Sequence, residues 1–506
     1  MKPGKIAESL ACIALLLLPA LNRQDGPLDY LASSPDAAEV LANLNECTTG
    51  LASGNATPDG RPLLWKNRDV GNMNQEFHYY DDGRIPFISI TYRAETDEYY
   101  GGVNAEGFAL ENSNSYNLQA GPYRNGFVQG GDDDGKIHTL ALSTCRTVDD
   151  FERLLDSTNT DGRTLNSNYG AIDAYGGAAI FETAGYSYTR CDAIDAPGGF
   201  LVRSNYSYSG AGVNNRPSFW GPHRHDSAYE LFQKAARDNE LTPLYLFQKV
   251  IRDVSVDGVD PYPLPFDGYY SDYPYGCLPN GEAVCRNTTR GIVVVQGVRA
   301  GGRPDDAILW AIGGSQLTTV AVPLWVRAGR VPEELDGANG GRICNRGIEL
   351  LDWVYTDGNF GQAVDTWKLT NPAGTGLWDF TLPLEQWVYD KTQRFLESPQ
   401  FSYDRLEAFQ AEMAAQVADS LEAWKPYASV SDVVLPRFED GGITLAWGDQ
   451  YIERDQPVPG HFLIHRSDEP FRAGIEGTLL AEVNEPRFHD SHPLPNGGYY
   501  KILAYF

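Results

Sequence analysis

Cys47 is the residue around which this sequence could organise chemistry, and it lies in the stretch NECTTGLASGNATPDGRPLLWKNRD, residues 45–69. A cysteine thiol cleaves amides efficiently when a base lies within hydrogen-bond reach and a donor stabilises the tetrahedral oxyanion. Histidine is the usual base, but none lies close to Cys47 in the sequence. If the chain is cut just before Cys47, the new α-amine, with an ordinary pKa of about 7.7–8.0, can accept the thiol proton. One residue would then supply both nucleophile and base.

Further blocks follow this cysteine in a fixed order: GGVNAEGFALENSNSYNL with its G-x-N-x-x-G-x-A pattern, then RSNYSY, then VPLWV. Together with the opening block they resemble the cysteine-type N-terminal-nucleophile hydrolases of linear amides. That grouping holds penicillin acyltransferase-like proteins, choloylglycine hydrolases and penicillin V acylases. The resemblance covers roughly residues 47–350. It implies an α+β fold with a four-layer αββα core and an autoprocessed cysteine amidohydrolase or acyltransferase.

The resemblance also implies roles for charged residues near the cysteine. Cys47 matches the nucleophile and new N-terminus, and Asp69 matches the aspartate that holds the α-amine. Choloylglycine hydrolases have an arginine three residues before that aspartate, whereas this chain has Lys66 there and Arg68 beside Asp69. Either cation could support a thiolate, although lysine lacks the bidentate fork of arginine. Both residues are therefore candidates.

Three further positions complete the site that the resemblance implies. Asn112 and Asn114 both fit the first oxyanion-hole asparagine, and the pattern of closer relatives favours Asn112. Asn205, in LVRSNYSY, fits the second asparagine. Arg224, in GPHRHDSAYELF, fits a late arginine that steadies the cluster. Each residue also has an ordinary structural explanation, since cysteines of exported proteins form disulfides, neighbouring charges form surface ion pairs and asparagines form turns.

The mechanism that follows begins on the chain itself. The Cys47 thiol attacks the Glu46 carbonyl, an N-to-S shift gives a thioester, and water releases the residues up to 46. The thiol then attacks a substrate amide and the α-amine returns the proton to the leaving nitrogen. The acyl-enzyme passes its acyl group to water or to another amine.

The substrate is less determined. The Tyr- and Pro-rich segment 260–285 could line an apolar or aromatic acyl pocket or be a rigid surface loop, and CLPNGEAVC within it predicts a disulfide between Cys277 and Cys285. A dipeptidase-like activity is an alternative, because another branch of the family begins with a similar Cys-Thr block. A second alternative is a non-enzymatic exported binding protein with Cys47 in a disulfide.

Strands and helices alternate along the part of the chain that carries these residues. Strand patterns occur in PLLWKN, IPFISITYR, YGGVNAEGFALEN, GAIDAYGGAAIFETAGYSYTR, GGFLVRSNYSY, GIVVVQGVR, AILWAIGG and TTVAVPLWV. Helices are predicted near 147–157, where a Thr-x-x-Asp pattern marks the start, near 227–238, and between about 385 and 425. This order favours sheets with helices packed outside them.

The C-terminal residues 427–506 show a different pattern. Six or seven short strand-like runs, among them GITLAWG and GYYKILAYF, occur in about eighty residues, which is typical of a small all-β sandwich. The segment resembles a fibronectin type III domain, and this resemblance implies a spacer or a cell-surface contact. The expected divisions are thus a signal peptide at 1–22, a pro-segment at 23–46, an amide hydrolase domain at 47–425 and this sandwich.

Composition limits the remaining possibilities. The formal net charge of -28 disfavours binding to nucleic acid and to anionic lipid. The leader MKPGKIAESLACIALLLLPALN resembles a secretory signal peptide, and its apolar run is too short for a membrane span, so we expect a secreted or periplasmic protein. The histidines and cysteines show no metal-ligand spacing, so no metal or cofactor is expected. The expected partner is a small-molecule N-acyl amide.

Overall fold

The computed structural model describes residues 46–119, 134–355, 363–371 and 374–424, and the C-terminal segments 427–429, 433–439, 442–447, 461–467, 478–484, 487–492 and 499–505. The expected signal peptide, the expected pro-segment apart from Glu46, and the expected junction at 425–426 lie outside these residues.

One sheet carries the candidate nucleophile. Its six strands are antiparallel and run in the order β10-β1-β2-β12-β13-β14. Their bounds are β1 (Glu46–Ala52), β2 (Leu63–Asp69), β10 (Phe200–Arg203), β12 (Thr289–Gln296), β13 (Ile308–Gly313) and β14 (Val322–Leu324). Nearly every residue of these strands is buried, which shows that both faces of the sheet are covered.

A second sheet is a meander whose seven strands follow one another in sequence order, from β3 to β9. They are β3 (Gln75–Tyr80), β4 (Phe87–Tyr92), β5 (Gly102–Asn104), β6 (Ala109–Asn114), β7 (Ser167–Ile172), β8 (Ala178–Thr183) and β9 (Tyr188–Asp192). Strands β6 and β7 lie against β1 and β2 of the first sheet. The two sheets therefore face each other, and Leu51, Leu64, Ile90 and Ile180 belong to their common core.

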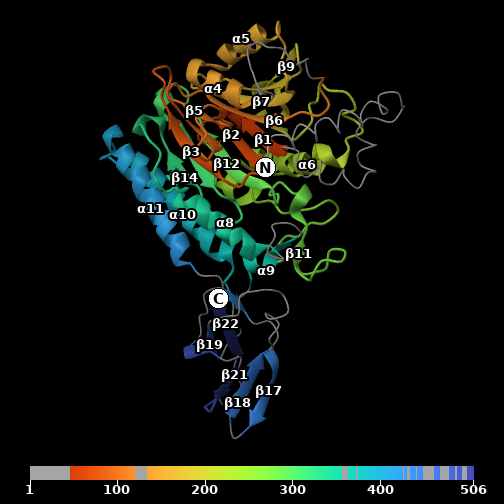
Figure 1. The fold of residues 1–506 in the computed structure, drawn as a ribbon, viewed down its shortest axis with the longest axis vertical. Coiled ribbons are helices and arrows are strands. Elements are labelled where there is room, and N and C mark those ends of the chain that lie inside the picture. The colour runs from red at the N-terminus through yellow and green to blue at the C-terminus, as the bar shows by residue number, and fades with distance from the viewer. Residues whose placement is uncertain are drawn as a thin grey trace, which may run out of the picture. The chain divides into compact units, whose positions relative to one another are not determined.

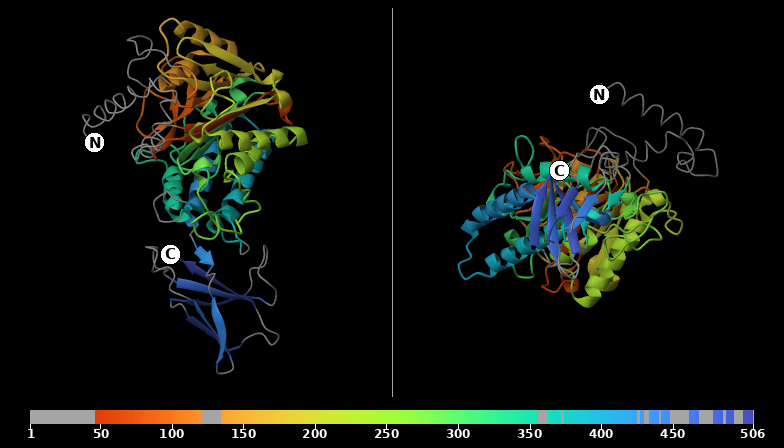
Figure 2. Two further views of the ribbon diagram at one scale, coloured as in Figure 1. Left: turned by 90° about the vertical axis from the view of Figure 1, so that its right-hand side faces the viewer. Right: turned by 90° about the horizontal axis from the view of Figure 1, so that it is seen from below.

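Helices cover the outer faces of both sheets (Figures 1 and 2). Helices α4 (Asp134–Thr144) and α5 (Val148–Thr158) pack on the seven-stranded sheet, where Leu142 and Phe151 meet Phe181. Helices α6 (Pro222–Asp238), α10 (Leu377–Glu397) and α11 (Leu406–Ala423) contribute Phe232, Val388 and Val417 to the core on the six-stranded sheet. The expectation of sheets with helices outside them is confirmed.

The predicted helices are present with small shifts of their ends. Helix α5 begins after Thr147, whose side chain forms a capping box with Asp150, as the Thr-x-x-Asp pattern predicts. Helix α6 begins at Pro222, earlier than predicted, because proline is well suited to a first helical turn. The helical region between 385 and 425 is two helices, α10 and α11.

Several elements were not predicted. They are β1, β3, α4, α8 (Arg342–Val354), the one-turn helices α7 (Pro243–Tyr245) and α9 (Thr366–Leu369), the π-helix η6 (Leu246–Val250), and the two-residue strands β11 (Cys277–Leu278) and β15 (Val364–Asp365). Short 3₁₀ turns are η2 (Gly54–Ala56), η3 (Ala193–Asp195), η4 (Pro197–Gly199), η5 (Ser218–Trp220), η7 (Asn280–Glu282), η8 (Pro304–Asp306), η9 (Val326–Ala328) and η11 (Tyr403–Arg405). Strand β1 is rich in small residues, so its pattern alone does not identify a strand.

The predicted disulfide between Cys277 and Cys285 is wrong, since neither cysteine forms a disulfide in the described structure. Polar contacts close this turn instead. The Asn280 side chain donates to the Cys285 carbonyl (2.6 Å) and to the Tyr355 hydroxyl (2.9 Å). Cys277 pairs with Asp365 across β11 and β15, whereas Cys285 lies in a separate apolar cluster with Val254 and Leu278.

The described C-terminal residues form two further sheets. A four-stranded sheet has the order β16-β22-β19-β20, and a three-stranded sheet has the order β17-β18-β21. The strands are β16 (Tyr427–Ser429), β17 (Val433–Glu439), β18 (Gly442–Trp447), β19 (His461–Ser467), β20 (Thr478–Val483), β21 (Arg487–Asp490) and β22 (Tyr499–Tyr505). Leu445 of one sheet and Phe462, Ile464 and Ile502 of the other form one buried cluster, so the two sheets pack face to face. Among all the described residues, no helix combines the length and apolar character that a membrane crossing requires.

Candidate active site

The pairing of β1 with β2 decides which side chains share a face. Cys47 lies opposite Arg68, Thr49 opposite Lys66, and Glu46 opposite Asp69. Directly opposed residues of antiparallel strands point to the same face, and neighbours along a strand point to opposite faces. The thiol, Lys66 and Arg68 therefore start on one face, and the carboxylates of Glu46 and Asp69 start on the other.

Contacts with neighbouring elements agree with this division. Lys66 Nζ donates to Asn112 Oδ1 on β6 of the facing sheet, at 2.5 Å. On the other face, Asp69 Oδ1 accepts a hydrogen bond from the Thr289 hydroxyl of β12, also at 2.5 Å, and Asp69 Oδ2 lies 3.9 Å from a guanidinium nitrogen of Arg224 in α6. The predicted site residues are thus distributed over both faces at one end of the β1–β2 pair.

Cys47 is a free thiol with 5% of its surface exposed. Burial raises the pKa of the Cys47 thiol, because the charged thiolate loses water. The positive charge of Lys66 lowers this pKa, Asp69 raises it, and Arg68 lowers it with a smaller effect than Lys66. In the uncut chain the thiol therefore holds its proton, and Lys66 is the cation that most favours the thiolate.

The two candidate cations have different surroundings. The Arg68 guanidinium lies over the Tyr100 ring at 3.7 Å and over the Tyr92 ring at 4.9 Å, and its Nε donates to Gln75 at 2.9 Å. Lys66 reaches Asn112, and its charge acts on both Cys47 and Glu111. Arg68 is thus tied into an aromatic cluster, whereas Lys66 acts on the polar groups near the thiol.

Asp69 is buried, and desolvation raises the pKa of its carboxyl to about 6 although Arg286 and Arg224 and the Thr289 hydrogen bond favour the charged form. Nearby Glu46 also raises this pKa, because it adds a second negative charge. The carboxyl of Asp69 therefore titrates close to neutral pH in the uncut chain.

Arg224 connects the residues on both sides of the Glu46–Cys47 bond. Its Nη1 donates to the Cys47 carbonyl and to the Thr48 hydroxyl, both at 3.0 Å. Its Nη2 donates to Glu46 Oε2 at 2.8 Å and to Asn205 Oδ1 at 2.9 Å. The side chain is 1% exposed, so this position of the guanidinium is fixed by buried hydrogen bonds.

Asn205 and Asn112 have different environments, and Asn114 takes part through its backbone carbonyl. Asn205 accepts from Arg224 and donates through Nδ2 to the Asn114 backbone carbonyl at 3.0 Å. Asn112 accepts from Lys66 and donates through Nδ2 to the Ser167 hydroxyl at 3.0 Å. Asn205 thus lies with Arg224 on one side of the site, and Asn112 lies with Lys66 on the other.

Sequence reasoning missed Arg286, which donates to the same Glu46 carboxylate oxygen as Arg224 and lies 3.8 Å from Asp69 Oδ2. It is separated from Glu46 by 240 residues. The only local signal is its position directly after the segment 260–285. Tyr116 was missed as well. Its pKa is raised first by burial and then by the charge of Glu46, which places the Tyr116 hydroxyl within electrostatic reach of the same group.

Glu111 is a further buried carboxyl near the site. Burial raises its pKa well above the usual range, and Lys66 partly opposes this shift. Its carboxyl lies over Gly170 of β7, where an added Cβ would come within 2.0 Å of Glu111 Oε1. Gly170 therefore makes room for an acid that contributes to the surroundings of Lys66.

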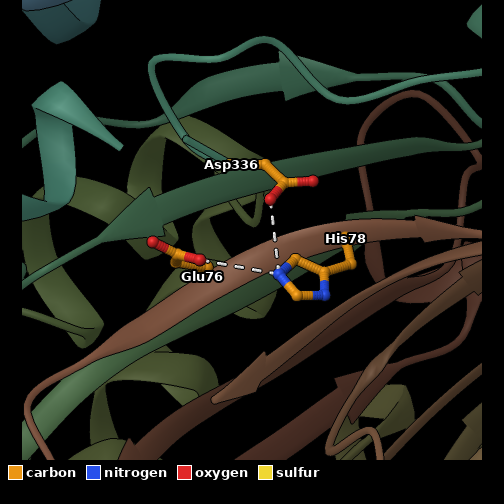
Figure 3. Close-up of side chains that lie close together, drawn as sticks. All are labelled: Glu76, His78 and Asp336. Carbon is orange, nitrogen blue, oxygen red and sulfur yellow. Dashed lines mark ion pairs between the residues drawn. The ribbon is translucent and has the colours of Figure 1, made fainter. Parts of the chain in front are cut away.

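Glu76, His78 and Asp336 form the one cluster of potential metal ligands among the described residues (Figure 3). Nε2 of His78 lies 3.6 Å from Glu76 and 3.3 Å from Asp336. Burial lowers the pKa of His78, but the nearby carboxyl groups of Glu76 and Asp336 raise it by more, so the overall shift is upward. Glu76 also accepts from Arg93 at 2.9 Å, so a cation already neutralises the carboxylate. The arrangement is that of an imidazole between two carboxyl groups, which favour its protonated form.

Comparisons with known proteins give distant similarities. No family model and no curated protein sequence matches the chain. A conjugated bile acid hydrolase from Clostridium perfringens, solved as a mutant, is 11% identical, with 55% of this chain and 92% of that chain covered at a TM-score of 0.35. A penicillin V acylase from Agrobacterium tumefaciens is 14% identical, with 55% and 86% covered at a TM-score of 0.33. The inference on function below therefore depends on the residues of the site.

Proposed function

We propose that the protein is an autoprocessed cysteine amidohydrolase or acyltransferase that cleaves linear N-acyl amides through an acyl-enzyme on Cys47. One observation carries the proposal: Arg224 holds the Glu46 side chain and the Cys47 carbonyl at once, with Asp69 opposite Glu46 on the next strand. Cleavage between Glu46 and Cys47 would need both sides of that bond to be held in place, and the new α-amine of Cys47 would need a carboxylate nearby.

The first reaction is on the chain. The Cys47 thiol attacks the Glu46 carbonyl carbon, the C–N bond breaks as the C–S bond forms, and the proton passes to the new α-amine. Water then hydrolyses the thioester and releases the peptide that ends at Glu46. The buried contacts of Arg224 supply the orientation that makes an intramolecular attack effective.

The second reaction uses the new amine. Because Asp69 lies opposite Glu46, its carboxylate is adjacent to the point where the chain would begin. It would hold the amine and stabilise its protonated form while the thiol attacks a substrate carbonyl. Lys66 favours the thiolate, and Asn205 with Asn112 or Asn114 would donate to the oxyanion.

The proposed architecture, C-terminal domain and export follow from the resemblances described above. The two facing sheets with helices on their outer faces support the four-layer αββα core. The three-stranded and four-stranded C-terminal sheets support a fibronectin type III-like sandwich at 427–506, with a role as spacer or cell-surface contact. The leader, with its resemblance to a secretory signal peptide, supports export from the cytoplasm.

The test is the mass and N-terminal sequence of the purified protein. We expect wild-type protein to begin at Cys47 and Cys47→Ala to keep the preceding residues and to lack amide hydrolysis. Cys145→Ala is the matched control, since Cys145 is another buried free thiol, on the far side of the seven-stranded sheet with α4 and α5. Wild-type protein that hydrolyses N-acyl amides while still carrying residues before Cys47 would contradict autoprocessing.

The alternative of a binding protein predicted that Cys47 is in a disulfide, and this prediction is wrong because the thiol is free. Amide hydrolysis that depends on Cys47 would distinguish an enzyme from a binding protein whose Cys47 thiol is unused. A panel of N-acyl amides and dipeptides, each assayed with Cys47→Ala as a blank, would show an N-acyl amide preference if the proposal holds.

A further inference from the structure

We propose that the acyl site is built for an acyl group that ends in a carboxylate, with the spacing of a glutaryl group, and that Arg224 and Arg286 bind that carboxylate. The inference rests on the proposed function, because it treats Glu46 as the first acyl group that Cys47 cleaves.

The Glu46 side chain is held as a ligand would be. Its Oε2 accepts hydrogen bonds from Arg224 Nη2 at 2.8 Å and from Arg286 Nη1. The residue is 6% exposed, although glutamate is rarely buried unless it is paired. Hydrogen bonds between guanidinium and carboxylate are among the stronger ones in proteins. The carboxylate thus occupies a built anion site of two arginines.

The covalent position of Glu46 indicates which part of a substrate the anion site would bind. Glu46 supplies the carbonyl of the bond that the thiol attacks, so its side chain lies on the acyl side of the reaction. Three carbon atoms separate this carbonyl from the side-chain carboxyl, the same number as in a glutaryl group. An acyl-enzyme formed from a glutaryl amide would therefore reproduce the thioester formed during processing, without the main-chain nitrogen.

Loss of Glu46 leaves the two cations undercompensated. Asp69 Oδ2 is 3.9 Å from Arg224 and 3.8 Å from Arg286, beyond hydrogen-bond length, and the proposed mechanism assigns this carboxylate to the α-amine. Glu282 also interacts with both arginines, but within the described structure it forms no hydrogen bond or ion pair with either of them. A buried cation that loses its partner is costly, so a new carboxylate in the place of Glu46 would be favoured.

Arg224 would stay in place after the release. Arg224 keeps its bonds to the Cys47 carbonyl, to Thr48 and to Asn205. Only the contact of Nη2 with Glu46 disappears, which leaves a donor aimed at the vacated position. Such preorganisation reduces the cost of binding.

The reaction is an ordinary acyl transfer. The thiol sulfur bonds to the amide carbonyl carbon of the glutaryl amide, the C–N bond breaks, and the amine leaves with the proton carried by the α-amine. Water then attacks the thioester, and glutarate and the free thiol are formed. No oxidant, reductant or metal is needed.

The experiment uses the processed protein and a series of 7-amino-4-methylcoumarin amides. The acyl groups are glutaryl, its neutral analogue valeryl, the shorter succinyl, the longer adipyl, and α-glutamyl, which keeps the amino group of Glu46. We expect kcat/KM for glutaryl or α-glutamyl to exceed that for valeryl by at least about tenfold, given the strength of hydrogen bonds to charged groups. The comparison of glutaryl with α-glutamyl decides between a simple diacid and an N-terminal glutamate.

Arg286→Met should reduce the glutaryl-to-valeryl ratio of kcat/KM, because only Arg224 then remains to bind the carboxylate, and Arg286→Lys should restore part of the ratio. Arg299→Met is a matched control, because Arg299 is an exposed arginine that contacts Asp59. It should leave the ratio unchanged.

The outcomes separate the two proposals. Hydrolysis that depends on Cys47 but favours valeryl would overturn the carboxylate site and leave the amidohydrolase standing. Absence of hydrolysis dependent on Cys47 for every amide, in this series and in the wider N-acyl panel, would overturn the proposed function. In that case calorimetry on the same protein still decides the site, since glutarate should bind more tightly than valerate, and equal or weaker binding would overturn it.

Discussion

Cys47 and Arg68 lie directly opposite each other on β1 and β2, yet the Arg68 guanidinium is stacked on Tyr100, and Lys66 is the cation with the larger effect on the thiol. Lys66 is thus the residue placed to favour the thiolate. The extra arginine beside Asp69 is held by aromatic rings.

Substitution of Lys66 tests this assignment. Lys66→Met removes the main charge that lowers the pKa of Cys47, so the pH at which Cys47 is half-maximally alkylated by iodoacetamide should rise. Arg68→Met should move that pH upward by less. Mass spectrometry of the Cys47 peptide across a pH series measures both shifts. A larger shift for Arg68→Met would reverse the assignment.

The acid limb of the pH–rate profile tests Asp69. Its carboxyl must be charged to hold the α-amine, so activity should fall as the pH decreases through its pKa, which is about 6 in the uncut chain. The processed protein should show this fall at lower pH, because the Glu46 charge that raises the pKa is gone and an ammonium group has been added.

Thr289→Val sharpens that test. The Thr289 hydroxyl donates to Asp69 and favours its charged form, so its loss should raise the pKa of Asp69 and move the acid limb to higher pH. Thr288→Val is the control, since the neighbouring Thr288 hydroxyl is buried and makes no hydrogen bond within the described structure. Equal shifts in the two variants would show that the limb does not report Asp69.

A buried ion pair away from the site should dominate the stability of the helix layer. Arg252 contacts both carboxylate oxygens of Glu385 in α10, at 2.7 and 3.0 Å, and both side chains are 1% exposed. Arg252→Met would leave the Glu385 charge buried, and the free energy of unfolding should fall by about 3–5 kcal/mol. Guanidinium chloride titration measures the loss.

The exposed pair of Arg330 with Glu407 provides the comparison for this effect. Arg330→Met should cost at most about 1 kcal/mol, because surface ion pairs are weak. If the two variants lose similar free energy, the Arg252–Glu385 pair does not have the stabilising role assigned to it.

The raised pKa of His78 predicts how the stability contributed by this residue changes with pH. The folded protein raises the pKa of His78, so its contribution to stability is fully present below the unfolded pKa of about 6.5 and is lost as the pH rises through the folded pKa. The difference in unfolding free energy between wild type and His78→Gln should therefore be larger at pH 5.5 than at pH 9. A metal site at the same residues would show the opposite trend, with a difference that grows with pH and with added zinc.

Local patterns were sufficient for much of the fold. The capping signal at Thr147 and the apolar spacing of α10 and α11 predicted helices because these signals act within a few residues. Strand β1 escaped prediction because ECTTGLA, although it contains two threonines, lacks the regular alternation of apolar and polar residues that marks a strand. It becomes a strand between β10 and β2, where partners on both sides satisfy its backbone hydrogen bonds.

The residues of the candidate site divide in the same way. The sequence by itself places Lys66, Arg68 and Asp69 close behind Cys47, and the resemblance of these blocks to a known family suggested a nucleophile that also becomes an N-terminus. Residues so near in the chain lie on adjacent strands, so their proximity is a local property.

Only the tertiary structure decided which charges meet. It placed Cys47 and Asp69 on different faces, left Cys277 and Cys285 without a disulfide between them, and brought Arg286 to Glu46 across 240 residues. The physical reason is that strand order and sheet packing are set by burial of the whole core, and no short pattern encodes them. Glu46, which the sequence presents as the last residue of a segment to be discarded, is therefore the residue on which the proposed glutaryl-like acyl group is based.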